Sequence, residues 1–314
     1  MSEDLDRAVH AVLHRCLAVR EGEEVVIVGD HSTADIAAAL RDEAERAGAD
    51  ATLVVATARA TDGEEPSKAV AEALAAADVF VAPTAWSISH TRARKRASDA
   101  GARGATMPHV TADMLTRLMA ADFDLMGHRS RAVAELLSAA DGAHLTCPRG
   151  TDLRLDLTGR PAIADDGDLT APGAFGNLPC GEGFVSPIGG EGTVHASSLA
   201  AIGLSDPPAV LTVDGGRLRA AQGAAGERLL ERLGAAGEQG TNLAELGVGT
   251  NERARLTGNI LEDEKMLGTV HVAFGASAGI GGTVSVPVHL DVLVLDATLT
   301  VGDTTVLDGG RFVL

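Results

Sequence analysis

Residues 284–295 read V-S-V-P-V-H-L-D-V-L-V-L, and their hydrophobic and polar positions alternate as in a β-strand with one apolar face. Successive side chains of a strand point to opposite faces, so His289 and Asp291 share a face. The opposite face carries apolar side chains: Val288, Leu290 and Val292. An imidazole and a carboxylate on one face are typical of a metal-binding strand, although a half-exposed strand has the same pattern.

A second strand-like run, G-T-V-H-V-A-F-G at 268–275, places another imidazole upstream. It carries His271, so the two runs together offer two histidines and one carboxylate. Such side chains can occupy one face of a divalent transition-metal ion. The sequence therefore predicts a metal site that includes His271, His289 and Asp291.

Helical and strand patterns alternate over the first 140 residues. Apolar residues recur at helical spacing in some segments, and short apolar runs such as E-V-V-I-V-G lie between them. This alternation predicts a parallel sheet with helices on both faces, an α/β fold. The predicted strands are 24–29, 51–56, 79–83 and 104–107. The predicted helices are 5–19, 34–47, 67–76, 92–100, 113–119 and 130–140.

The pattern changes at residues 141–148, after which strands with Gly and Asp turns dominate. Residues 153–157, L-R-L-D-L, alternate strictly, and D-G-G at 214–216 predicts a tight turn. One helix is predicted at 225–233. With a length of 314 residues, this change predicts two domains. They are an α/β domain at 1–142 and a mainly antiparallel β (α+β), metal-binding catalytic domain at 143–314.

The composition argues against several function classes. The formal net charge of −18 disfavours a nucleic-acid partner, because phosphate contacts need clustered Lys and Arg. No stretch reaches the roughly 18–20 apolar residues of a membrane span, and the acidic start M-S-E-D-L-D-R does not resemble a signal peptide. The cysteines are odd in number and far apart, which favours a reducing cytoplasm. They are Cys16, Cys147 and Cys180. We expect a cytoplasmic protein that acts on a small molecule or a peptide.

Two glutamates stand in unusual surroundings. Glu182 ends the run N-L-P-C-G-E, in which Pro and Gly fix the backbone, and Glu245 lies among small and apolar residues in A-E-L-G-V-G-T-N. A glutamate in a turn is usually solvated, whereas a buried carboxylate is usually paired or bound to a metal. Residues 262–265, E-D-E-K, precede the first histidine run, and we interpret them as the solvated charged end of a helix.

Several short motifs, in this order, resemble the aminopeptidase T superfamily of metallopeptidases, also called the thermophilic metalloprotease family. They are N-L-P-C-G-E at 177–182, A-E-L-G-V-G-T-N at 244–251, L-T-G-N-I-L-E-D-E-K at 256–265, G-T-V-H-V-A-F-G at 268–275 and H-L-D at 289–291. In the first half, H-T-R-A-R at 90–94, D-A-G-A-R at 99–103 and V-T-A-D-M-L at 110–115 are similar to short members of the superfamily. The resemblance covers most of the chain.

This resemblance implies five metal ligands: Glu182, Glu245, His271, His289 and Asp291. It also implies one or two divalent ions (Zn²⁺, Co²⁺, Mn²⁺ or Fe²⁺) that activate a water molecule. Glu182 or Glu245 would bridge the ions or act as general base. We therefore expect a homodimeric metal-dependent hydrolase, similar to the aminopeptidases of this family, that removes an N-terminal residue or cleaves a small amide.

The sequence departs from the peptidase pattern in two respects, of which one is that the segment between His271 and His289 is shorter than in the true peptidases. The peptidases of this family have a tyrosine a few residues after the first histidine, whereas this chain contains no tyrosine. The corresponding segment 276–282, A-S-A-G-I-G-G, offers only Ser277 as a polar side chain. The tyrosine would donate a hydrogen bond to the developing oxyanion, and the loss of such a donor can lower the rate by orders of magnitude. Its absence therefore weakens the expectation of peptidase activity more than the expectation of a metal site.

A second branch of the superfamily, the ring-opening 2,5-dihydroxypyridine dioxygenases, is similar to this chain as well. That resemblance implies one Fe²⁺ held by His271, His289 and Asp291, with positions open for O₂ and substrate. His195 in E-G-T-V-H and His109 in M-P-H-V-T would be candidate catalytic bases. The alternative function is therefore an Fe(II)-dependent dioxygenase that cleaves a small hydroxylated heteroaromatic ring. A third hypothesis is a metal-stabilised binding protein without activity.

Overall fold

The chain forms two compact units in the computed structural model, which describes residues 3–314. Met1 and Ser2, which begin the acidic N-terminal stretch, lie outside the described residues. The predicted boundary at residue 142 falls inside the second unit. Unit 1 contains the residues up to Ala121 together with Gly167–Cys180, and unit 2 contains Asp122–Asp166 and Gly181–Leu314.

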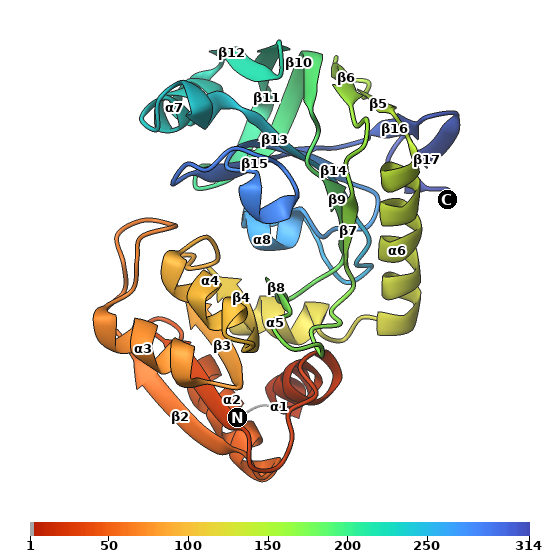
Figure 1. Ribbon diagram of the computed structural model, residues 1–314. Helices are drawn as coiled ribbons and strands as arrows, with labels where there is room; N and C mark the ends of the chain where they lie inside the picture. The colour runs from red at the N-terminus through yellow and green to blue at the C-terminus, as the bar shows by residue number, and fades with distance from the viewer. Residues whose placement is uncertain (1–2) are drawn as a thin grey trace. The chain divides into compact units, whose positions relative to one another are not determined.

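Unit 1 is built on a parallel sheet with the strand order β2-β1-β3-β4-β8 (Figure 1). Its strands are β1 (Glu24–Gly29), β2 (Asp50–Val55), β3 (Val79–Thr84), β4 (Arg103–Pro108) and β8 (Phe175–Asn177). β1, β3 and β4 are buried over nearly their whole length. β1 and β3 are nearly continuous apolar runs, as is typical of strands covered on both faces, whereas β4 also buries Arg103 and Thr106. The α/β prediction for this half is confirmed, whereas β8 has no counterpart among the predicted strands.

Helices flank this sheet in two groups. They are α1 (Glu3–His10), a π-helical segment (Ala11–Cys16), α2 (Ala34–Arg46), α3 (Lys68–Ala76), α4 (Arg92–Asp99) and α5 (Ala112–Leu118). α1 packs against α2 and α5, while α3 packs against α4. The chain runs from β1 to β2 and then reverses its direction across the sheet. Because parallel crossovers are right-handed, this reversal places the two groups on opposite faces, as predicted.

Unit 2 contains a large antiparallel sheet with the order β18-β17-β16-β5-β6-β10-β15-β14-β13-β9-β7, and β11 and β12 extend it from β10. The first strands are β5 (Gly142–Thr146), β6 (Asp152–Asp156), β7 (Ala162–Asp165), β9 (Glu182–Val185), β10 (Gly189–Leu199), β11 (Gly203–Asp214) and β12 (Arg217–Gln222). The remaining strands are β13 (Leu243–Gly249), β14 (Val270–Gly275), β15 (His289–Val294), β16 (Thr298–Val301), β17 (Thr304–Asp308) and β18 (Arg311–Phe312). The predicted antiparallel β-rich fold of this half is confirmed.

A few helices accompany the antiparallel sheet. They are α6 (Phe123–Ala139), α7 (Ala224–Gly234), α8 (Ile260–Asp263) and 3₁₀ turns at Glu238–Thr241 and Ala278–Ile280. α6 begins well before the predicted residue 130, because the Asp122 carboxylate accepts hydrogen bonds from the backbone N–H groups of Asp124 and Leu125. α7 packs on β11 and β12 (Figure 1). Among the described helices, none is long and apolar enough to cross a membrane.

The two histidine runs form neighbouring strands, β14 and β15, in the middle of the sheet. Leu290 and Val292 of β15 belong to the main hydrophobic core of unit 2, so the predicted alternation of faces is confirmed. β15 begins only at His289, since the proline at 287 lacks the N–H that a central strand must donate. The apolar core therefore anchors one face of β15 and leaves the other for chemistry.

Candidate metal centre

Four neighbouring strands of unit 2 carry the five predicted ligands. Glu182 begins β9, Glu245 lies on β13, His271 on β14, and His289 and Asp291 on β15. The strands are adjacent in the order β15-β14-β13-β9, so residues far apart in the sequence become neighbours. The structure therefore brings all five side chains into one cluster.

The cluster consists of two triplets of ligand atoms that share one carboxylate. His271 Nε2 lies 3.2 Å from Glu182 Oε2 and 3.3 Å from Glu245 Oε1. His289 Nε2 lies 3.3 Å from Glu245 Oε2 and 3.5 Å from Asp291 Oδ1. Within each triplet the ligand atoms lie within 4.8 Å of one another, close enough to hold a metal ion. Glu245 thus lies between the two imidazoles, with one oxygen toward each.

The donor set fits a divalent ion. Glu182, Glu245 and His271 are at most 6% exposed, and charged groups buried so deeply are usually paired or metal-bound. His289 Nδ1 donates a hydrogen bond to the Ala276 carbonyl at 2.7 Å, which orients the ring and directs Nε2 into the cluster. Glu182 Oε2 is buried and, among residues 3–314, accepts no hydrogen bond of good geometry, although His271 Nε2 lies 3.2 Å away. Imidazole and carboxylate oxygen together suit Zn²⁺, Fe²⁺, Mn²⁺ or Co²⁺.

Gly247, which the sequence analysis did not single out, makes room for the His271 ring. It lies opposite His271 in the pairing of β13 and β14. A Cβ atom at Gly247 would lie 2.1 Å from His271 Nε2, well inside van der Waals contact. Only a residue without a side chain therefore permits the observed position of this imidazole.

Gly247→Ala is expected to weaken metal binding by about 10–100-fold, the usual effect of disturbing the groups that orient a ligand. The new methyl group would push the His271 ring out of the cluster. Metal titration by calorimetry measures the change. The matched control is Gly234→Ala at the end of α7, where an added Cβ meets no atom within 4 Å. Equal metal affinity in the two variants would contradict the assignment.

A buried lysine lies against the cluster. Lys265 is 1% exposed, and its Nζ donates hydrogen bonds to Glu182 Oε1 at 2.5 Å and Glu264 Oε1 at 2.8 Å. The Asp165 carboxylate lies 3.8 Å from the same nitrogen. The interpretation of residues 262–265 as a solvated helix end is therefore wrong, because all four are buried. The run of three acids and one lysine directly before the first histidine strand was the only sequence signal for this group.

The lysine and its carboxylates influence one another's ionisation. Burial raises the pKa of Glu264 to about 8 and that of Asp165 to about 7, although Lys265 opposes both shifts. Burial also raises the pKa of Glu182, but Lys265 and His271 outweigh it and lower that pKa below its ordinary value. For Lys265, burial lowers the pKa, but Glu182 and Glu264 outweigh it and hold the pKa well above the usual range. Lys265 is thus a permanent positive charge beside an ionised Glu182.

The other ligands form charge pairs when no metal is bound. Burial raises the pKa of Glu245, but hydrogen bonds with His271 and His289 outweigh it and lower the pKa to about 2. Burial lowers the pKa of His271, but Glu182 and Glu245 outweigh it and raise the pKa well above 6.5. Asp291 and Glu245 raise the pKa of His289 in the same way against the effect of burial. In the metal-free protein, the neighbouring carboxylates therefore favour the doubly protonated, positively charged form of both imidazoles.

Metal binding at pH 7 is expected to release about two protons, because an imidazole binds a metal only in its neutral form. The imidazole pKa values are raised on folding, so these protons stabilise the metal-free fold fully below about pH 6.5. That contribution is lost as the pH rises through the folded pKa values, and metal affinity increases over the same range. Calorimetric titration in buffers of different ionisation enthalpy measures the proton count. A binding heat that does not change with the buffer would contradict this prediction.

The two histidines predicted as bases lie outside the metal cluster. His195 lies on β10, and its ring covers Gly150, where a Cβ would lie 2.8 Å from Nε2. His109 belongs to unit 1, where its Nε2 lies 3.1 Å from Asp62 Oδ1 and its ring meets the edge of Trp86 at a centroid distance of 5.3 Å. A carboxylate that orients an imidazole is a common arrangement for a base, so the role of His109 stays a prediction.

The buried donor set on the antiparallel sheet defines this part of the protein as a candidate metal centre. Comparison with known families makes the assignment narrower. The chain belongs to the 2,5-dihydroxypyridine 5,6-dioxygenase (NicX) family, whose family model matches residues 4–314. A search of curated protein sequences finds no match.

Two solved structures share the whole fold. The 2,5-dihydroxypyridine dioxygenase from Pseudomonas putida KT2440 is 20% identical, with a TM-score of 0.85 over 100% of this chain and 98% of that chain. Wild-type AmpT from Thermus thermophilus is also 20% identical, with a TM-score of 0.73 over 99% of each chain. Both resemblances stated from the sequence are thereby confirmed at the level of family and fold.

Proposed function

We propose that this protein is an Fe(II)-dependent dioxygenase that cleaves the ring of a small hydroxylated heteroaromatic compound such as 2,5-dihydroxypyridine. This reverses the preference for a hydrolase drawn from the sequence. Membership of the dioxygenase family over residues 4–314 supports the reaction class. The observation that carries the choice of one ion is Lys265, whose ammonium group is hydrogen-bonded to Glu182, one of the two glutamates that a second ion would need.

The charge balance of the centre also favours one ion. Glu264 and Asp165 have pKa values of about 8 and 7, so both hold a proton for much of the time near neutral pH. Three carboxylates then remain around the histidines: Glu182, Glu245 and Asp291. One lysine and one divalent ion together balance them, whereas a second divalent ion would leave excess positive charge in a buried site.

By the dioxygenase resemblance we assign the ion to His271, His289 and Asp291, although the two imidazoles belong to different triplets of converging ligand atoms. Glu245, which is common to both triplets, is a further carboxylate between them. Two imidazoles and one carboxylate are the ligand set of non-haem iron oxygenases, and a ferrous ion held this way supplies O₂ activation at open positions. The contact of His289 Nδ1 with the Ala276 carbonyl orients one of these ligands. The glycine at 247 leaves space for the other.

Two further side chains can handle the hydroxyl groups of the substrate. Glu182 is held as an anion by Lys265 and is only 6% exposed, so it can accept a hydrogen bond from a ring hydroxyl. Glu264, with a pKa of about 8, is mostly protonated at pH 7 and can donate one. His195 and His109 remain the predicted bases outside the cluster.

A metallohydrolase is the second candidate, and one observation favours it. Glu245 presents one oxygen to each imidazole, as a carboxylate that bridges two ions would. The absence of tyrosine weighs against peptidase activity, because it removes the oxyanion donor that the peptidase resemblance implies.

The deciding experiment loads metal-free protein with Fe²⁺ under anaerobic conditions and then supplies O₂ with a panel of hydroxylated pyridines. We expect O₂ uptake in step with loss of the ring absorbance for at least one compound. The same protein loaded with Zn²⁺, Co²⁺ or Mn²⁺ is tested on aminoacyl nitroanilides and small amides. Hydrolysis by these forms, with no O₂ uptake by the iron form, would overturn the proposal in favour of the second candidate.

A further inference from the structure

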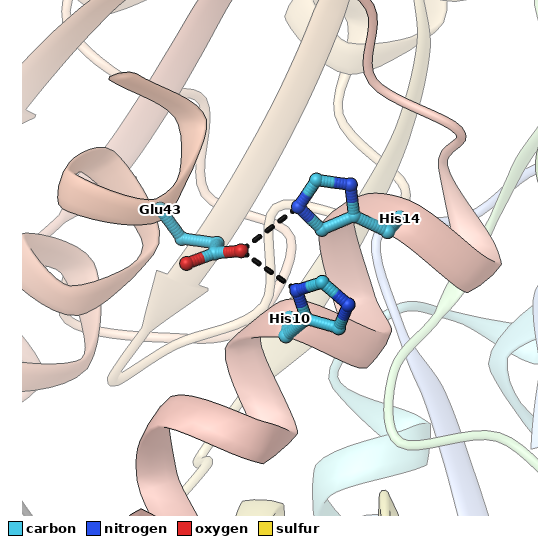
Figure 2. Close-up of side chains that lie close together, drawn as sticks. All are labelled: His10, His14 and Glu43. Atoms are coloured by element: carbon cyan, nitrogen blue, oxygen red, sulfur yellow. Dashed lines mark hydrogen bonds and ion pairs between the residues drawn. The ribbon is translucent and has the colours of Figure 1, made fainter. Parts of the chain in front are cut away.

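A second group of metal-ligating side chains lies in unit 1, at the N-terminal helix. His10 ends α1, His14 lies in the π-helical segment that follows, and Glu43 projects from α2 (Figure 2). The two imidazole rings lie side by side, with centroids 4.1 Å apart. Both face the same carboxylate, so three donor atoms converge from two packed helices.

The donor atoms are close enough for one ion. His10 Nδ1 and His14 Nε2 each lie 2.8 Å from Glu43 Oε1. Ligands of a tetrahedral zinc ion lie about 3.3–3.4 Å apart, given metal–ligand distances of roughly 2.0–2.1 Å. The rings therefore need to move outward by only about half an ångström, in line with the 64% and 34% exposure of their side chains.

The Glu43 carboxylate is held so that its Oε1 atom faces the two imidazoles. The Glu43 side chain is only 8% exposed, and its other oxygen, Oε2, accepts a hydrogen bond from Arg46 Nε at 2.8 Å. Burial raises the pKa of Glu43, but His10, Arg46 and His14 outweigh it and lower that pKa. The carboxylate is therefore an ionised and positioned donor.

The backbone at this place is unusual as well. Residues 11–16 form a π-helix, and the N–H of Leu17 bonds to the Val12 carbonyl at 3.1 Å, five residues back. π-helical turns are rare and are found frequently at functional sites. Here the wider turn begins directly after His10 and contains His14.

We propose that His10, His14 and Glu43 bind one divalent ion of the Zn²⁺ class, with water at the remaining positions, and that this ion fastens the N-terminal helix to α2. Two imidazoles and one carboxylate are ligands that zinc accepts, and the exposed side of His10 leaves room for water. The site uses none of the ligands of the unit 2 centre, so it does not depend on the function proposed above.

The test compares wild-type protein, the double variant His10→Ala/His14→Ala, and the control His128→Ala, which removes an exposed histidine from helix α6. Each metal-free protein is titrated with Zn²⁺ alone, which fills the unit 2 centre in all three proteins, and the equivalents bound beyond that centre are compared. We expect one additional equivalent in the wild type and in the control, and at least a 100-fold weaker affinity for it in the double variant.

Two further measurements complete the test. Zn²⁺ added beyond the filling of the unit 2 centre is expected to raise the melting temperature of the wild type and the control but not of the double variant, while all three keep the same O₂ uptake when loaded with Fe²⁺. The variant Glu43→Gln, which keeps the side-chain shape, should also lose the additional equivalent. The proposal is overturned if the double variant binds the additional Zn²⁺ as tightly as the wild type, or if the wild type binds no additional equivalent below millimolar concentration.

Discussion

Replacing His289 with alanine is expected to lower activity by about 1,000-fold or more, beyond the roughly 10–100-fold cost of losing a group that only orients a ligand. His289 is the imidazole whose Nε2 faces both Glu245 and Asp291, so its removal takes the nitrogen ligand from that triplet and leaves Glu245 with His271 alone. The unit 2 centre should lose its metal at the same time. Elemental analysis and turnover measured on one preparation check both outcomes.

A histidine of the same sheet provides the control. His144 lies on β5, where it contacts Asp152 at the surface and no predicted ligand. His144→Ala should retain full metal content and activity. The assignment of the centre is wrong if His289→Ala keeps both its metal and its turnover.

Replacing Lys265 with methionine is expected to lower the free energy of unfolding of the metal-free protein by about 3–5 kcal/mol, the usual cost of removing one partner from a buried ion pair. Methionine fills most of the volume but leaves Glu182 without its ammonium donor. The pKa of Glu182 should then rise, since Lys265 is the main group that lowers it. Urea unfolding at pH 7 measures the stability change.

The matched control is Lys95→Met on α4. Lys95 is 66% exposed and pairs with Asp99 across one helical turn, so its loss should change stability by no more than about 0.5 kcal/mol. If both variants unfold at the same urea concentration, Lys265 is not part of a buried charge network. The Lys265→Met protein also tests the single-ion proposal, because Glu182 without its ammonium partner is free to bind an added equivalent of metal.

The strands β14 and β15 could be predicted because the alternation that defines each of them is visible within a short stretch of sequence. A period of two places His289 and Asp291 on one face whatever the rest of the chain does, and β14 and β15 confirm it. The two glutamates needed the family motifs as well, since nothing local distinguishes Glu182 from a solvated turn residue.

Other features depend on contacts between segments that lie far apart in the sequence, so no single stretch predicts them. Whether residues 262–265 face water or the core is decided by Asp165 and Glu182, which come from distant strands, so the burial of Lys265 was missed. β8 is three residues long and becomes a strand only by pairing with β4 in unit 1. Its segment lies within the half that the sequence assigns to the β-rich domain.

The ligand strands also have a consequence for the order of events during folding. Lys265 and Glu182 are 83 residues apart in the chain, and β9, β13, β14 and β15 must all be paired before the cluster exists. Pairing of such distant segments is slow, because closing long loops costs entropy before contacts repay it. A chain that ends before β15 has no second imidazole and cannot complete the cluster. Capture of the ion therefore marks the pairing of these four strands, and the metal distinguishes molecules in which they have paired from those in which they have not.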